Sequence, residues 1–160
     1  MKLPSSLLVT TLDENRQLTN LEELRAGRTM VIDLWHSKCV KCPAALDKLN
    51  DLAGSSSSSS DDVLYVSCAL SQGPGNIDLA CEMVADTWEN LTHVFMEVEV
   101  KEEAKALFGF NAVPFVIVVD KDGNVIGHGD PKTVDYAALV AGGAAAAAGA
   151  SAPLFLDEDF

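Results

Sequence analysis

Hydrophobic residues gather in short runs that are separated by polar or mixed segments along most of the chain. Runs of about four to eight such residues are typical of strands buried within a sheet. The segments TMVIDLW and FVIVVD are nearly continuous, whereas the segment from His93 to Val98 alternates valine and methionine with other residues. The pattern predicts strands over residues 6–12, 29–35, 63–69, 93–98, 115–120 and 125–129.

Between these runs, apolar residues recur at spacings of three and four, which places them on one face of a helix. This spacing predicts helices over residues 21–25, 42–53, 77–91 and 100–108, and a last helix from 133. Asp122-Gly123 between the last two strands is typical of a hairpin turn. Strands that alternate with helices and end in one hairpin predict an α/β fold with a mixed central sheet flanked by helices.

Two segments have too little variety of side chains to build a core. The unbroken serine run from Ser55 to Ser60 predicts a mobile loop over residues 54–62. Residues 142–160 are rich in alanine and glycine and end in acidic residues, so we expect a flexible tail there. The remaining residues, 1–141, are predicted to form a single domain. The serine loop follows the helix that begins at residue 42, so we expect it to lie far from any site at that helix's start.

The overall charge limits the partners that the chain can have. Its 160 residues include 24 Asp and Glu but 11 Lys and Arg, giving a net charge of −13. Nonspecific binding to nucleic acid or to anionic membranes needs cationic patches, so we expect neither. No apolar stretch reaches the roughly 20 residues of a membrane span, and the first residues lack the apolar core of a signal peptide. We therefore expect a cytoplasmic monomer. Because the sequence contains no motif that resembles a nucleotide-binding loop, we also expect no cofactor.

The candidate chemistry lies in Cys39-Val40-Lys41-Cys42, between a predicted buried strand and a predicted helix. A thiol at a helix N-terminus faces unpaired N–H groups and the positive end of the helix dipole, which favour the thiolate. In such settings the cysteine pKa falls from about 8.5 to roughly 3.5–7.5. The positive charges of Lys38 and Lys41 also favour the thiolate. The two intervening residues let the sulfurs meet, so the pair can close a disulfide, with Cys39 the more accessible member.

Two further features favour redox chemistry over a structural role for this pair. Asp33 is a carboxylic acid inside an otherwise apolar strand, where burial is costly without a partner or a purpose. A buried carboxylate near the second sulfur could accept its proton, although Asp33 could instead be a hydrogen-bonded structural acid. Val113-Pro114 stands directly before a buried strand, where proline is tolerated. A cis bond there would form a tight turn that can abut the cysteines.

The other candidate residues have simpler explanations. Twelve residues separate Cys68 from Cys81, whereas paired zinc ligands stand about two to four residues apart. We therefore expect no metal site, a buried free thiol at Cys68 and a core position for Cys81 on its helix stripe. His36 is interpreted as a surface residue beside the motif.

The segment from Asp33 to Cys42 is similar to the active-site strand and motif of thioredoxins, and residues 111–115 (NAVPF) resemble the cis-proline turn of that family. Residues 106–129 and the extra helix and strand over 77–98, which plain thioredoxin lacks, resemble the TlpA-like and tryparedoxin subgroup. The resemblance covers residues 5–141 and implies a thioredoxin fold with a five-stranded core. It implies that Cys39 attacks, that Cys42 resolves, that Asp33 is the buried acid and that Pro114 is the cis-proline.

The motif also departs from the family pattern. Lys38 stands where the family usually has Trp, and Lys41 where it often has Pro. We predict that Lys38, Lys41 and Val113 form a substrate surface, and that lysines in place of an apolar Trp suit acidic partners. The sequence thus predicts a protein-disulfide reductase whose partners are disulfide-containing client proteins and an external reductase or dithiol. Two alternatives remain: a non-catalytic thioredoxin-like subunit of a larger assembly, and a thiol peroxidase.

Overall fold

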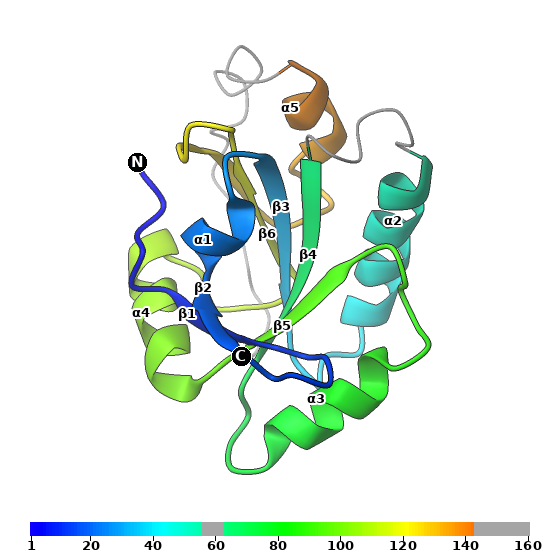
Figure 1. Ribbon diagram of the computed structural model, residues 1–160. Helices are drawn as coiled ribbons and strands as arrows, with labels where there is room; N and C mark the ends of the chain where they lie inside the picture. Colours follow the sequence, from blue (N-terminus) through cyan, green and yellow to red (C-terminus); the bar gives the residue numbers. More distant parts are fainter. Residues whose placement is uncertain (56–62, 143–160) are drawn as a thin grey trace.

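The computed structural model of the chain describes residues 1–55 and 63–142 (Figure 1). The predicted serine loop and C-terminal tail fall largely on residues 56–62 and 143–160, outside the described residues. None of the helices that the structure describes is long and apolar enough to span a bilayer.

A seven-stranded mixed sheet forms the centre of the molecule, with the strand order β2-β1-β5-β4-β3-β6-β7. Strands β3, β4 and β5 are parallel, while β6 runs antiparallel to β3 and makes the predicted hairpin with β7. The pair β1 and β2 extends the opposite edge by antiparallel pairing with β5. The strands span Leu8–Thr11 (β1), Leu18–Asn20 (β2), Thr29–Trp35 (β3), Val63–Leu70 (β4), Thr92–Met96 (β5), Phe115–Val119 (β6) and Val125–Gly129 (β7).

Helices cover both faces of this sheet. Helices α2, α3 and α5 lie on one side of the sheet, and α1 and α4 on the other (Figure 1). The apolar strands β3 and β6 are buried along nearly their whole length between these layers. The helices span Leu21–Arg25 (α1), Cys42–Ser55 (α2), Asn76–Val84 (α3), Val98–Phe108 (α4) and Tyr136–Gly142 (α5).

The structure confirms the α/β fold with a mixed sheet, and most of the predicted elements. It places α1, β3 and β7 at the predicted bounds. It adds the short strand β2, whose three residues are too few to show a period. The last helix begins at Tyr136 rather than at Thr133, because Thr133 donates both its backbone N–H and its hydroxyl to the carbonyl oxygen of Asp130 in a turn.

The helix that was predicted over residues 77–91 is wrong beyond Val84. The chain turns back after this residue, and Asp86 and Trp88 adopt positive φ angles of 62° and 50°. Trp88 nevertheless packs edge-on against Trp35, with ring centroids 6.3 Å apart, and donates its indole N–H to Asp47 at 2.6 Å. Trp88 therefore fits the helical spacing of apolar residues because it is buried, although it lies in the turn that follows α3.

A chain of hydrogen bonds joins this turn to the central sheet. The indole N–H of Trp35 donates to the hydroxyl of Ser67 at 3.3 Å, and that oxygen lies 2.6 Å from Nδ1 of His93. Nε2 of His93 lies 3.0 Å from the carbonyl oxygen of Trp88. Burial lowers the pKa of His93, so the ring is neutral at pH 7. It accepts from Ser67 through Nδ1 and donates to Trp88 through Nε2.

Gly109 ends α4, just before the segment that carries Pro114. It adopts the left-handed conformation with φ 71°, and its N–H caps the carbonyl oxygen of Lys105. A Cβ at this glycine would meet nothing within 4 Å. The requirement for glycine is therefore conformational and not steric.

We expect Gly109→Ala to lower the free energy of unfolding by about 1 kcal/mol, because alanine disfavours this backbone conformation. Gly109→Asn should cost less, since asparagine tolerates it better. Denaturant titration of both variants measures the difference. An equal loss in the two variants would contradict a conformational origin.

Candidate active site

The antiparallel pairing of β3 with β6 brings two distant segments of the chain together. Leu34 near the end of β3 lies opposite Phe115, the first residue of β6. The residues that follow β3 therefore meet those that precede β6. Sγ of Cys39 lies 3.7 Å from the carbonyl oxygen of Val113, and the Val113–Pro114 peptide bond is cis. These predicted site residues form one cluster.

Cys39 and Cys42 are joined by a disulfide, with their Cα atoms 5.5 Å apart. Cys42 is completely buried, whereas Cys39 is partly exposed. Lys38 and Lys41 are both exposed, and Val40 between the cysteines is 90% exposed. The sulfur that an external partner can reach is therefore that of Cys39, surrounded by cationic and apolar side chains.

Helix α2 begins at Cys42, so Cys39 precedes the helix by three residues and is not part of its first turn. Pro43 occupies the second helical position, where its missing N–H would have had no helical partner. The 14-residue helix still directs its positive N-terminal end toward the motif. This end of α2, together with Lys38 and Lys41, makes the surroundings of the two sulfurs electropositive.

His36 supports the loop that carries the first cysteine. Its backbone carbonyl oxygen accepts the N–H of Cys39 at 3.1 Å, and its Nδ1 accepts the N–H of Lys38 at 3.1 Å. The side chain is 8% exposed, so the expectation of a surface histidine is wrong. Burial, and then the charges of Lys101 and Lys38, lowers the pKa of His36. The neutral ring accepts the Lys38 N–H and turns the chain at this point.

Helix α3 adds a second support for this loop. Asn76, its first residue, donates its side-chain N–H to the hydroxyl of Ser37 at 2.9 Å and accepts the N–H of Gln72. The extra helix therefore contacts the active-site loop directly. No sequence pattern indicated this contact, because Asn76 and Ser37 are 39 residues apart.

Asp33 is buried on β3, with 2% of its surface exposed. Among the described residues, its Oδ1 atom has no hydrogen-bond partner. Burial raises the pKa of Asp33 well above its ordinary value. Its charge, in turn, adds to burial in raising the pKa of Tyr136 to about 12 and in raising that of Cys68. Asp33 is therefore a buried acid that is close enough to act electrostatically on Tyr136 and Cys68.

The other two cysteines differ from each other. Cys68 on β4 is completely buried, as predicted for a free thiol in the core. Cys81 on α3 packs against the core as predicted, but it is only partly buried. It borders a shallow pocket beside Arg16. No cluster of three or more metal-ligating side chains occurs within residues 1–55 and 63–142.

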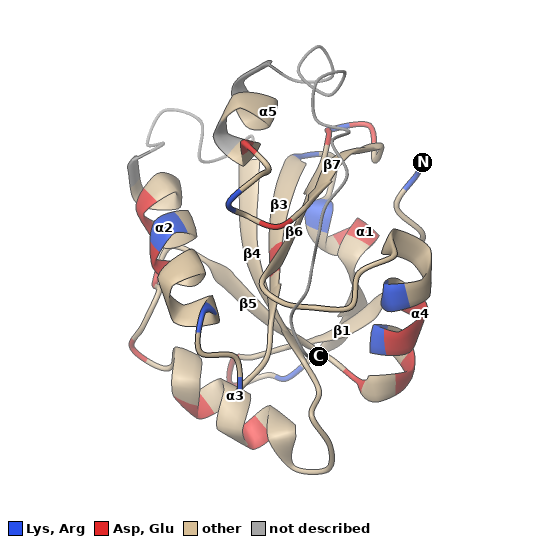
Figure 2. Ribbon diagram, turned by 180° about the vertical axis from the view of Figure 1, so that it is seen from behind, with Lys and Arg blue, Asp and Glu red and all other residues tan. Residues whose placement is uncertain are grey.

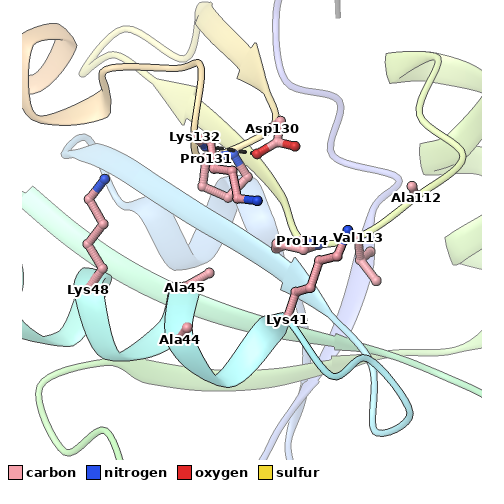
Figure 3. Close-up of a pocket in the computed structure, with 10 residues that line it drawn as sticks. All are labelled: Lys41, Ala44, Ala45, Lys48, Ala112, Val113, Pro114, Asp130, Pro131 and Lys132. Carbon is pink, nitrogen blue, oxygen red and sulfur yellow. Dashed lines mark hydrogen bonds between the residues drawn. The ribbon is translucent and has the colours of Figure 1, made fainter. Parts of the chain in front are cut away.

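A pocket of about 420 Å³ adjoins the cis-proline turn (Figure 3). Predicted residues Lys41, Val113 and Pro114 line it, whereas Lys38 does not. Sequence reasoning missed the remaining lining residues. No periodic signal related Lys41 to Lys48, because Lys41 precedes α2, which begins at Cys42. The pocket is also lined by Ala44, Ala45, Lys48, Ala112, Asp130, Pro131 and Lys132.

Comparison with known proteins identifies the fold but no close relative. No protein-family model matches the sequence, and no curated protein matches it. Among solved structures, a thiol:disulfide interchange protein from Bacteroides sp. aligns with a TM-score of 0.61 and 14% identity, over 79% of this chain and 78% of that one.

Two further structures give the same result. The thioredoxin domain of a thiol-disulfide oxidoreductase from Bacteroides vulgatus aligns with a TM-score of 0.59 and 13% identity, over 78% of this chain and 85% of that one. A thioredoxin-like protein from Aeropyrum pernix aligns with a TM-score of 0.58 and 13% identity, over 77% and 80% of the two chains. Together with the Cys39–Cys42 disulfide beside a cis-proline, these likenesses show that the chain has the thioredoxin fold, of the type found in thioredoxin-like thiol–disulfide oxidoreductases.

Proposed function

We propose that the protein is a thiol–disulfide oxidoreductase that reduces disulfides of client proteins through Cys39 and Cys42. The observation that carries this proposal is the disulfide itself, placed with Sγ of Cys39 3.7 Å from the carbonyl oxygen of the residue before the cis-proline. A purely structural disulfide would gain nothing from a partly exposed sulfur among lysines. The fold that this chain shares with solved oxidoreductases supports the same chemistry.

In the reduced protein, the Cys39 thiolate attacks one sulfur of a client disulfide. A bond forms between Cys39 and that sulfur, the client disulfide breaks, and the other client sulfur leaves as a thiolate that takes up a proton. Cys42 then loses its proton and attacks Sγ of Cys39. The Cys39–Cys42 disulfide forms, and the second client thiol is released. Two electrons have passed to the client, and an external dithiol restores the reduced pair.

The two cysteines have different environments, and this difference supports the proposed order of attack. Cys39 is partly exposed and close to two lysines, which favours both access and the thiolate form. Cys42 is completely buried, so only a group already bound to Cys39 comes within its reach. We propose that Asp33, a buried acid on the preceding strand, accepts the Cys42 proton during resolution.

The variant Cys42→Ser tests the proposed order. With a disulfide-containing peptide, it should stop at a covalent adduct on Cys39 that intact-mass spectrometry detects, because the resolving thiol is missing. Cys39→Ser should form no adduct and reduce no disulfide. Cys81→Ser is the matched control and should keep the wild-type rate, since Cys81 lies on α3, outside the cluster.

An adduct on Cys42 or Cys81 would contradict the proposed order. Wild-type protein that reduces no disulfide with dithiothreitol present would instead favour the interaction-subunit alternative. Rapid consumption of peroxide would favour the peroxidase alternative.

Asp33→Asn should make the protein more stable at pH 7 and slow the release of the mixed disulfide. The folded protein has a raised Asp33 pKa, so above about pH 4 the unfolded chain ionises first and unfolding becomes more favourable. Removing the charge should raise the free energy of unfolding at pH 7 by about 1.4 kcal/mol for each unit by which folding raises the Asp33 pKa, up to pH 7. The gain should disappear as the pH falls below about 4, where both states are protonated.

Urea titrations at pH 7 and at low pH measure this gain, with Asp51→Asn on the exposed face of α2 as a control of equal charge change. Resolution should slow by about a hundredfold, the lower end of what general acid–base catalysis contributes. A variant that is less stable at pH 7 and resolves at the wild-type rate would show that Asp33 is only a structural acid.

A further inference from the structure

The pocket beside the cis-proline turn has an unusual balance of charge for this chain. Three of its lining residues are lysines and one, Asp130, is acidic, although the whole chain carries a net charge of −13. Oδ1 of Asp130 accepts the backbone N–H of Lys132 at 2.8 Å, so this carboxylate is engaged in its own turn. The pocket is therefore a cationic site on an acidic protein.

The uncharged part of the pocket is formed by alanines, valine and prolines, which carry no polar side-chain group. Side-chain recognition of a polar ligand in the pocket thus depends on the lysines. In Figure 3, the side chain of Lys41 extends from the start of α2 toward Val113, and that of Lys48 extends from α2 on the side where Pro131 and Lys132 lie. Small residues, Ala44 and Ala45, lie between them and leave room for a bound chain.

The three lysines reach the pocket from elements that the fold fixes. Lys48 lies on α2, with Nζ 5.6 Å from the centre of the Tyr136 ring on α5. Lys132 follows β7, whose last residue, Gly129, pairs with Val116 near the start of β6. This pairing places the residues after β7 beside the same cis-proline turn. Elsewhere acidic residues are common, and the two charged residues of α3 are both acidic (Figure 2).

The pocket is also connected to the reacting sulfur. Val113 lines the pocket, and its carbonyl oxygen is the atom that lies 3.7 Å from Sγ of Cys39. Lys41 lines the pocket and stands between the two cysteines in the motif. A peptide whose disulfide reaches Cys39 can thus extend its neighbouring residues into the pocket.

We propose that Lys48 and Lys132 select client proteins whose reactive cysteine is flanked by aspartate or glutamate, through ion pairs in this pocket. The inference rests on the proposed function and adds the chemical class of the client. At about 0.1 M salt the Debye length is about 10 Å, so exposed acidic residues farther than this from the pocket have little effect on a ligand bound there. Lys38 is exposed but does not line the pocket, so it is not part of this selection.

The test uses short peptides of one length, each with a single cysteine as a mixed disulfide with thiopyridine and flanked by two Glu, two Gln or two Lys. Reduced protein releases the neutral thiopyridone, whose absorbance gives a second-order rate constant. Each constant is divided by that of dithiothreitol with the same peptide, which removes the intrinsic effect of the flanking charge. At ~0.1 M salt the Glu peptide should react about tenfold faster than the Lys peptide, and at 1 M the rates should converge.

The double variant Lys48→Gln/Lys132→Gln should lose most of this preference. Lys41 is left in place because it also acts on the neighbouring thiols. The matched control is Lys105→Gln/Lys121→Gln, which changes the net charge equally at α4 and at the β6–β7 turn, and it should keep the preference.

Equal reaction of the three peptides with wild-type protein would overturn the inference and leave the proposed function intact. An equal loss of preference in both double variants would also overturn it, because the selection would then come from the overall charge. Wild-type protein that reacts with none of the peptides would overturn the proposed function as well.

Discussion

The pairing of β3 with β6 is the constraint on which the site depends. The two strands run in opposite directions, so the end of one lies beside the start of the other. The cysteine pair follows β3, and the cis-proline turn precedes β6. The hydrogen bonds between these two strands therefore bring the pair and the turn together, although they are far apart in the sequence. β3 also pairs with β4 along its whole length, which fixes its position from the other side. The two sulfurs thus lie just beyond the end of a central, buried strand.

The same strand creates a conflict between packing and charge. Asp33 lies among apolar residues that exclude water, so its ionisation costs more free energy in the folded protein than in the unfolded chain. The opposite condition holds a short distance along the chain, where Lys38 and Lys41 are exposed and the first turn of α2 favours anions. A carboxyl group whose burial favours its neutral form thus precedes a loop whose surroundings favour negative charge. The proposed mechanism uses both environments.

Sequence patterns predicted what depends on local periodicity and missed what depends on contacts between distant segments. The apolar run that became β3 and the end of α4 at Phe108 were predicted correctly, because both follow from the local pattern of apolar residues. Trp88 was placed on a helix because burial from a turn can produce helical spacing. Lys132 was missed since only the β6–β7 pairing brings it to the site. His36 was misjudged because its partners are backbone groups, which every residue carries.

The hydrogen bonds from Trp35 through Ser67 and His93 to the Trp88 carbonyl have a consequence for how this fold could change in evolution. The extra helix, its turn and β5, which carries His93, are not a separable module. Their loss would leave the Ser67 hydroxyl in the sheet interior without its imidazole neighbour, and would expose the face of the Trp35 ring on the very strand that carries Asp33. A descendant without this segment would therefore have to replace Trp35 and Ser67 together. The two positions are expected to covary with the presence of the segment, whatever happens to the cysteines.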